Sequence, residues 1–126
     1  MIKGTGMDLV RIERIRRAID LQDGAFRRRT FSEKECAYAE EGRDPAVRYA
    51  GMYAVKEAVF KAVAHGTRHG NFDYRIVETG HHADGSPYVE VSPALQKLLA
   101  EAGIRQLHIS ITDEGDYAAA IAVAED

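Results

Sequence analysis

Three charged side chains in an otherwise apolar segment, one acid and two lysines, are the first residues whose types and spacing suggest chemistry. In YAVKEAVFKA, residues 53–62, Glu57 and Lys61 are four positions apart, so on a helix they lie on the same face. Their neighbours are almost all apolar, which indicates a helix that is buried on most sides and whose few charges face a cleft. The alternative is a surface ion pair, which would contribute only a few tenths of a kcal/mol.

Asp8 supplies a second carboxylate. It follows the glycines of GTGMD at the end of an expected strand, where a backbone can approach a ligand closely, and a simple turn aspartate is the alternative. Mg²⁺ binds one or two carboxylates and fills its other positions with waters and phosphate oxygens, while a lysine supplies a point charge to the phosphate. The sequence therefore predicts that Asp8, Glu57 and Lys61 form a magnesium and phosphate site.

The hydropathy and capping patterns predict the elements that must position these residues. We expect a strand at residues 1–8, helices at 11–19, 33–41 and 45–64, a hairpin of strands 74–79 and 87–91, a helix at 93–102, and a hairpin of strands 107–112 and 117–124. Ser32 and Glu35 form an expected capping box, and Asp44 with Pro45 marks another helix start. Without regular βαβ alternation, this order favours an α+β fold with helices packed on a largely antiparallel sheet.

Length and composition exclude several classes of protein. A chain of 126 residues with 45% hydrophobic and 29% charged residues is typical of one globular domain, which we place at residues 1–126. Its apolar runs are far shorter than the roughly 18–20 residues of a membrane span, and the first residues lack a signal-peptide core. A single cysteine, Cys36, cannot form an internal disulfide. We expect a cytoplasmic protein with no membrane partner.

The N-terminal segment is basic although the chain is acidic. Residues 1–29 carry eight Lys and Arg against four Asp and Glu, so their net charge is +4 and the rest of the chain carries −7. This asymmetry suggests an anionic partner, either a nucleic acid or an acidic protein, and a solvated helix face is the alternative. A nucleic-acid-binding module would leave Glu57 unexplained and would lack interleaved aromatics and a basic pI. We therefore expect no nucleic acid partner.

Three segments together resemble a known family. GTGMDLVRIERI, YAVKEAVFKA and HISITDEGDYAAAIAVAED are similar to the holo-acyl carrier protein synthases, the single-domain branch of the 4′-phosphopantetheinyl transferases. The resemblance covers essentially the whole chain and implies the 4′-phosphopantetheinyl transferase fold. It also implies transfer of the phosphopantetheine arm of coenzyme A to a serine of apo-acyl carrier protein. A homotrimer with active sites between its subunits is a further implication.

The resemblance also implies roles for individual residues. Asp8 and Glu57 match the carboxylates that bind Mg²⁺, and Lys61 matches the lysine on the coenzyme A pyrophosphate. Further coenzyme A contacts are expected from Lys56, Gly66, Thr67 and Asp113. The acidic recognition helix of the carrier protein is expected to meet Arg14, Arg27 and Arg28.

Several alternatives stay open at the level of sequence. Glu57 accepts the proton of the carrier serine either directly or through a metal-bound water. Members of the family usually have an arginine at the place of Met52, and AHGT at residues 64–67 replaces the usual GTG. These departures leave room for a paralogue that binds coenzyme A or a carrier protein without transferring the arm. The sequence also does not distinguish a fatty-acid carrier from a polyketide carrier.

Overall fold

The computed structural model describes residues 1–21, 23–64 and 73–126. Its elements in chain order are β1 (Ile2–Arg11), α1 (Ile12–Ile19), α2 (Ala25–Thr30), α3 (Glu33–Glu40), α4 (Pro45–Val63), the 3₁₀ turn η2 (Tyr74–Ile76), β2 (Val77–His81), β3 (Pro87–Val91), α5 (Pro93–Glu101), β4 (Gln106–Glu114) and β5 (Tyr117–Glu125). Within the described ranges, no helix has the length and apolar character needed to cross a membrane.

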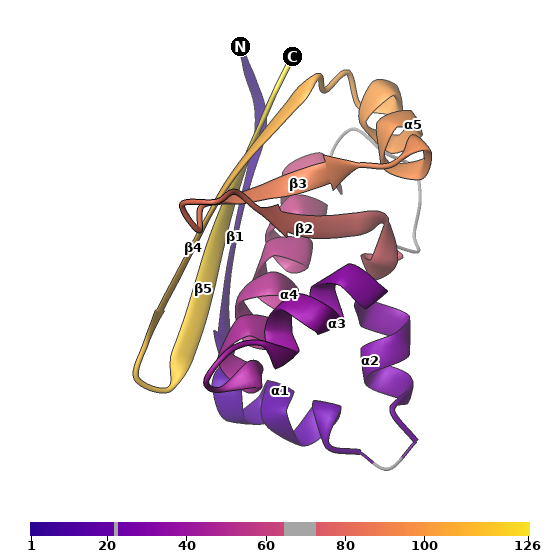
Figure 1. Ribbon diagram of the computed structural model, residues 1–126. Coiled ribbons are helices and arrows are strands. Elements are labelled where there is room, and N and C mark those ends of the chain that lie inside the picture. Colours follow the sequence, from indigo (N-terminus) through magenta and orange to yellow (C-terminus); the bar gives the residue numbers. More distant parts are fainter. Residues whose placement is uncertain (22, 65–72) are drawn as a thin grey trace.

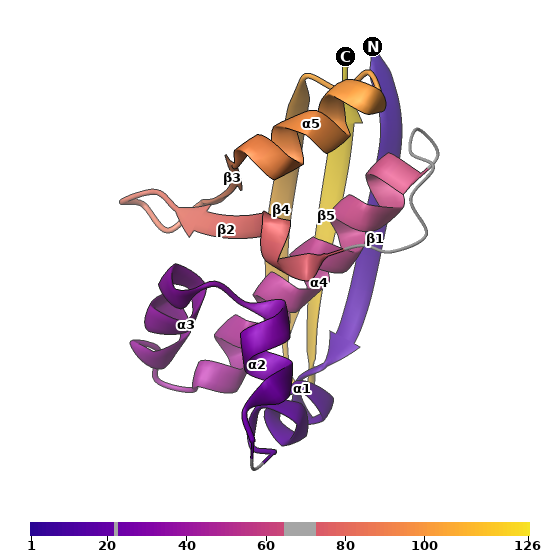
Figure 2. The same cartoon turned by 90° about the vertical axis from the view of Figure 1, so that its right-hand side faces the viewer.

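The strands form two antiparallel sheets. One has the strand order β1-β5-β4, and the other is the β2-β3 hairpin. The helices lie on one side of the three-stranded sheet, and α4 crosses its face (Figures 1 and 2). The two termini lie side by side, where the Met1 amino group donates to Asp126 Oδ1 at 2.7 Å. The predicted α+β fold, with helices on a largely antiparallel sheet, is confirmed.

Glycines in β1 allow α4 to pack directly on this strand. A Cβ atom added at Gly6 would overlap the carbonyl oxygen of Ala58, and one added at Gly4 would overlap that of Ala62. Since side chains alternate along a strand, Asp8 lies on the same face as these two glycines and therefore faces α4. The close approach of the two backbones is what brings Asp8 to the charged residues of α4. The strand expected to end at Asp8 continues to Arg11, so Asp8 lies within β1.

Gly6→Ala is expected to destabilise the protein by at least about 1–3 kcal/mol, because the new methyl group forces α4 away from β1. Urea unfolding of the two proteins at equal concentration measures the difference. Gly51→Ala is the matched control, since its Cβ would meet only the Ile111 side chain at 3.0 Å and alanine favours a helix interior. Equal stability of Gly6→Ala and the parent would contradict the proposed packing.

The predicted helix starts agree with the structure. The Glu35 amide donates to Ser32 Oγ at 3.2 Å and the Ser32 amide donates to Glu35 Oε1 at 3.0 Å, which completes the expected capping box. Asp44 is the N-cap of α4, and its side chain accepts from the Ala46 amide at 3.3 Å. Pro45 follows at the first helical position. These signals are local, and they set both starts correctly.

Two elements differ from the expectation. Helix α2 was not predicted. Its Phe26 ring lies 6.0 Å from that of Phe31, the residue after the helix, and 5.9 Å from that of Tyr53 on α4, which is a tertiary contact. The strand expected from residue 74 begins only at Val77, after η2. The Asp73 carboxylate caps this turn by accepting from the Arg75 amide at 2.9 Å. The contact between Phe26 and Tyr53 is not encoded in a helix pattern, whereas the Asp73 cap is a local signal that the strand pattern overrode.

Candidate active site

Glu57 is held by two tyrosines. Its Oε1 atom accepts hydrogen bonds from the Tyr53 hydroxyl at 3.0 Å and from the Tyr74 hydroxyl at 2.7 Å. Burial, together with the neighbouring Glu57 charge, raises the pKa of both tyrosines, so each hydroxyl keeps its proton and acts as a donor. The carboxylate therefore has a defined position although it is only partly buried.

Lys61, one helical turn after Glu57 on α4, lies beside Asp8 of β1. The Lys61 ammonium donates to the Met7 carbonyl at 2.8 Å and lies 3.5 Å from Asp8 Oδ1. The Asp8 side chain is only 18% exposed, whereas that of Lys61 is 51% exposed. Burial raises the pKa of Asp8; Lys61 opposes this rise and the charge of Glu57 adds to it. The structure thus brings together the three residues that the sequence singled out.

Lys56 does not lie in this site. Its side chain is fully buried, and the ammonium donates to Glu35 Oε1 at 2.9 Å, to the Tyr74 carbonyl at 2.9 Å and to the Val77 carbonyl. All three of its N–H donors are used inside the core. Burial lowers the pKa of Lys56, and the Glu35 charge opposes that shift. The prediction that Lys56 contacts coenzyme A is therefore wrong: its charge links α3 and β2 to α4.

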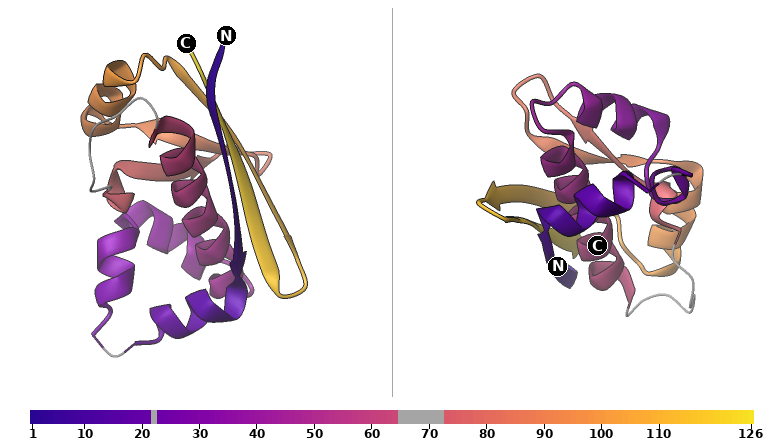
Figure 3. Two further views of the ribbon diagram at one scale, coloured as in Figure 1. Left: turned by 180° about the vertical axis from the view of Figure 1, so that it is seen from behind. Right: turned by 90° about the horizontal axis from the view of Figure 1, so that it is seen from below.

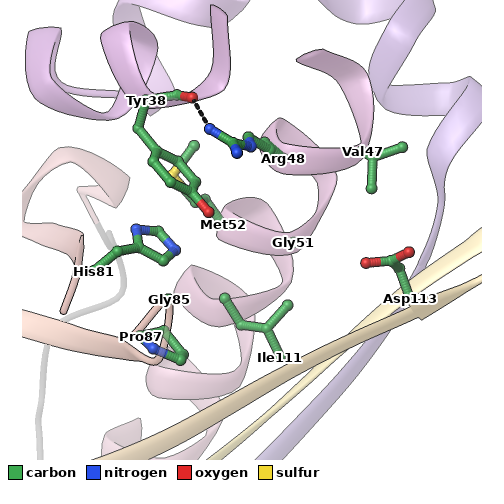
Figure 4. A pocket seen from close by; sticks show the side chains of 10 residues that line it. All are labelled: Tyr38, Val47, Arg48, Gly51, Met52, His81, Gly85, Pro87, Ile111 and Asp113. Carbon is green, nitrogen blue, oxygen red and sulfur yellow. Dashed lines mark hydrogen bonds between the residues drawn. The ribbon is translucent and has the colours of Figure 1, made fainter. Parts of the chain in front are cut away.

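Asp113 lies in a separate pocket, which residues of β4 and of the N-terminal half of α4 line together (Figure 4). The pocket has a volume of about 220 Å³ and also contains Met52. The Arg48 guanidinium lies 4.1 Å from the centre of the Tyr38 ring and donates to the Tyr38 carbonyl at 2.6 Å. The positive charge of Arg48 therefore lies one helical turn before Met52, the position at which members of the family usually have an arginine. The other two residues expected to contact coenzyme A, Gly66 and Thr67, lie outside the described residues.

The arginines expected to meet a carrier protein fall into two places. Arg14 is exposed on α1, and its guanidinium lies 5.8 Å from the centre of the Tyr53 ring, next to Glu57. Arg27 and Arg28 are exposed on α2 and line a pocket of about 510 Å³. Arg75 lines the same pocket, so three arginines from two segments gather there.

Comparison with known proteins decides the family. The sequence model of the 4′-phosphopantetheinyl transferase superfamily matches residues 4–122. The chain belongs to this superfamily. It is 38% identical over 125 residues to the holo-[acyl-carrier-protein] synthase of Neisseria meningitidis serogroup A, covering 99% of both chains. The solved structure of the synthase from Neisseria meningitidis covers 100% of both chains, with a TM-score of 0.87 and 37% identity.

A second similar structure is a complex with a ligand. It is a holo-(acyl-carrier-protein) synthase from Bacillus anthracis in complex with CoA (3′,5′-ADP). It is 28% identical to this phosphopantetheinyl transferase, covers 98% of this chain and 96% of its own, and has a TM-score of 0.77. The full-length match extends over both β1 and α4, the elements that carry Asp8, Glu57 and Lys61.

The donor set of the transferase suits a hard cation. Asp8 and Glu57 are two carboxylates on adjacent elements, and the neighbouring Lys61 is suited to a phosphate. In the described part of the chain, no three His, Cys, Asp or Glu side chains gather into a metal-binding group. Mg²⁺ does not require such a group, because waters and substrate phosphates complete its coordination. The two carboxylates would hold this ion between protein and substrate.

Sequence reasoning missed the roles of several residues around this site. Tyr53 precedes Glu57 by four positions, so helical spacing alone signals the contact that its hydroxyl makes. Tyr74 and Glu35 reach α4 from distant segments, and no local pattern indicates that they do. Arg48 lies beside Tyr38, which is also distant in sequence. These contacts become visible only in the folded chain.

Proposed function

We propose that this chain transfers the 4′-phosphopantetheine arm of coenzyme A to a serine of apo-acyl carrier protein and releases adenosine 3′,5′-bisphosphate. The observation that carries the proposal is the convergence of Asp8, Glu57 and Lys61 in a member of the superfamily. The names of its relatives support the carrier protein as acceptor, and the Bacillus anthracis complex supports coenzyme A as donor. The single cysteine accords with a reducing compartment, and we place the reaction in the cytoplasm.

The geometry supports a direct phosphoryl transfer. The serine oxygen forms a bond to the phosphorus that carries pantetheine, and the bond from this phosphorus to the bridging oxygen breaks, so that oxygen leaves with the nucleotide. Lys61 faces solvent beside Asp8 and stabilises the charge that develops on the phosphoryl oxygens. Glu57 accepts the serine proton, directly or through a water. Mg²⁺, when bound, supplies further neutralisation of phosphate charge.

Intact mass spectrometry tests the reaction. The protein is incubated with apo-acyl carrier protein, coenzyme A and Mg²⁺, and the carrier is weighed. We expect the mass increment of one phosphopantetheine group, its loss when a chelator is added, and its recovery with excess Mg²⁺. If fatty-acid and polyketide carriers all stay unmodified while a known transferase modifies the same preparations, the proposal fails. Binding of coenzyme A without that increment would identify the non-transferring paralogue.

We also propose that the chain forms a homotrimer with active sites at the subunit boundaries. One face of the sheet formed by β1, β5 and β4 is turned away from the helices (Figure 3). Large apolar side chains of β1 and β5 are exposed, including Met7 at 65%, Leu9 at 64% and Ile121 at 42%. Such a face favours self-association. The separation of the Asp113 pocket from Glu57 within one chain is compatible with a site shared between subunits. Light scattering should give three times the chain mass of 14.0 kDa.

Arg14→Glu is expected to raise the KM for the carrier protein about tenfold or more. The substitution places a negative charge next to the site, where it repels an acidic partner, and a tenfold effect corresponds to about 1.4 kcal/mol. Steady-state kinetics at low salt measure this constant. Arg105→Glu is the matched control, because Arg105 is also exposed but lies just before β4, where its amide donates to the Glu125 carbonyl at the end of β5. Equal effects of both reversals would contradict a local contact at Arg14.

A further inference from the structure

We infer that Tyr53 and Tyr74 are positioning residues that fix Glu57 as a preformed metal ligand. The inference rests on the proposed function, and it assigns to this site two residues beyond the three proposed to carry the reaction. Both hydroxyls donate to the same carboxylate atom, Oε1, at 3.0 Å and 2.7 Å. Within the described part of the chain, Oε2 receives no hydrogen bond, so it is the oxygen left for the cation.

The two tyrosines are themselves held in place. Their rings stack with centroids 5.8 Å apart and an interplanar angle of 22°. Phe26 packs against Tyr53 with a ring distance of 5.9 Å, and the Arg14 guanidinium lies over the same ring. Each hydroxyl is therefore presented by a ring whose orientation is set by its neighbours. A carboxylate that accepts from two such donors has little rotational freedom left.

The core sets the position of Tyr74 relative to α4. Its backbone carbonyl accepts from the buried Lys56 ammonium at 2.9 Å, and Lys56 is the residue before Glu57 on the helix. The same ammonium is paired with Glu35 at 2.9 Å. Helix α4 thus anchors the backbone of Tyr74 through Lys56 and receives the Tyr74 hydroxyl at Glu57. Because Lys56 and Glu57 are neighbours on α4, these two hydrogen bonds fix Tyr74 relative to the helix and make it a rigid support for the Glu57 carboxylate.

This support has an energetic consequence for metal binding. A free glutamate side chain loses rotamer entropy when it binds a cation, and this loss weakens metal binding. Glu57 has already lost most of that freedom, since the tyrosines hold it before any ligand arrives. Hydrogen-bond partners of metal ligands typically change metal affinity or activity by about 10–100-fold when they are removed. The tyrosine pair should have an effect of this size.

Phenylalanine substitutions test the inference, because they keep the rings and remove only the hydroxyls. The binding of Mn²⁺ in the presence of coenzyme A, without carrier protein, is measured by electron paramagnetic resonance for the parent, Tyr53→Phe, Tyr74→Phe and the double variant. We expect the Kd for Mn²⁺ to rise about 10–100-fold in the double variant and less in each single variant. The Mg²⁺ concentration for half-maximal rate should rise in parallel, while the KM for the carrier protein stays constant.

Tyr49→Phe is the matched control on the same helix. The Tyr49 hydroxyl donates to Glu40 Oε1 at 3.0 Å, so this variant loses a tyrosine–glutamate bond of the same kind at a different place. We expect it to bind Mn²⁺ like the parent. The single variants keep the test decisive if the double variant does not fold.

Three outcomes overturn the inference: a parent that binds no Mn²⁺, tyrosine variants whose Kd stays within twofold of the parent, or an equal rise in Tyr49→Phe. The mass-spectrometric assay of the parent distinguishes these outcomes from a failure of the proposed function. If the parent leaves every carrier unmodified, but removal of the tyrosine hydroxyls still lowers the affinity for Mn²⁺, the proposed function fails and the inference holds.

Discussion

Glu57→Gln is expected to lower kcat by about 10²–10⁴-fold, the range that a positioned proton acceptor contributes. Glutamine has the same shape, and its amide oxygen can still accept from Tyr53 and Tyr74. It carries no negative charge, so it takes no proton from the serine and is a much weaker ligand for Mg²⁺. The loss should therefore arise in the chemical step and in metal binding, with the fold and the carrier surface unchanged.

Carrier binding separates this role from a general defect. The Kd for apo-acyl carrier protein, measured by titration without coenzyme A, should stay within about threefold of the parent, because Arg14 and the other arginines are untouched. Glu40→Gln is the control: Glu40 also accepts from a tyrosine hydroxyl of α4, at 3.0 Å, and lies outside the site. The Glu40→Gln variant should have the same kcat as the parent. Near-normal turnover of Glu57→Gln would remove this residue from the mechanism.

Lys56→Met is expected to destabilise the protein by about 3–5 kcal/mol, the cost of leaving a buried carboxylate without its partner. Methionine resembles the lysine stem, so little packing is lost. The Glu35 carboxylate would keep its bonds to the Ser32 and Thr79 amides, at 3.0 Å each, but would lose the only cation paired with it in the described part of the chain. The Tyr74 and Val77 carbonyls would lose a donor as well.

Urea unfolding measures this cost, with all proteins at one concentration because assembly shifts apparent stability. Lys97→Met, at an exposed position of α5, is the matched control and should change stability by less than about 0.5 kcal/mol. Adding Glu35→Gln to Lys56→Met removes the unpaired charge and should recover part of the loss. A loss below about 1 kcal/mol in Lys56→Met would show that the buried pair contributes little.

Local signals in the sequence were sufficient for much of the fold. The Ser32 capping box and the Asp44-Pro45 start place α3 and α4 correctly because their hydrogen bonds join residues two or three positions apart. Alternation places β4 and β5 for the same reason, since the side-chain period of a strand is a property of the strand itself. Helix α2 escaped because its Phe26 ring packs on Tyr53 from a distant segment, and the turn η2 escaped although its Asp73 cap is a local signal.

In the candidate site, too, some features follow from local sequence patterns and others only from tertiary contacts. Helical spacing alone puts Glu57 and Lys61 on one face, and strand alternation puts Asp8 on the face of Gly4 and Gly6. That these two faces meet was only an expectation, and the contact between β1 and the backbone of α4 decides it. The proximity of Asp8 and Lys61, at 3.5 Å, is a result of that packing.

The two lysines of YAVKEAVFKA mark the limit of what the sequence determined. Their spacing of five residues turns them about 140° apart on a helix, so they point to different faces, although the family resemblance implied that both contact coenzyme A. Only the tertiary structure decides which face is which. Helix α3 brings Glu35 to Lys56 and makes it a core residue, while β1 brings Asp8 to Lys61 and leaves that lysine at the solvent. A side chain's chemistry depends on partners from distant segments, and packing selects those partners.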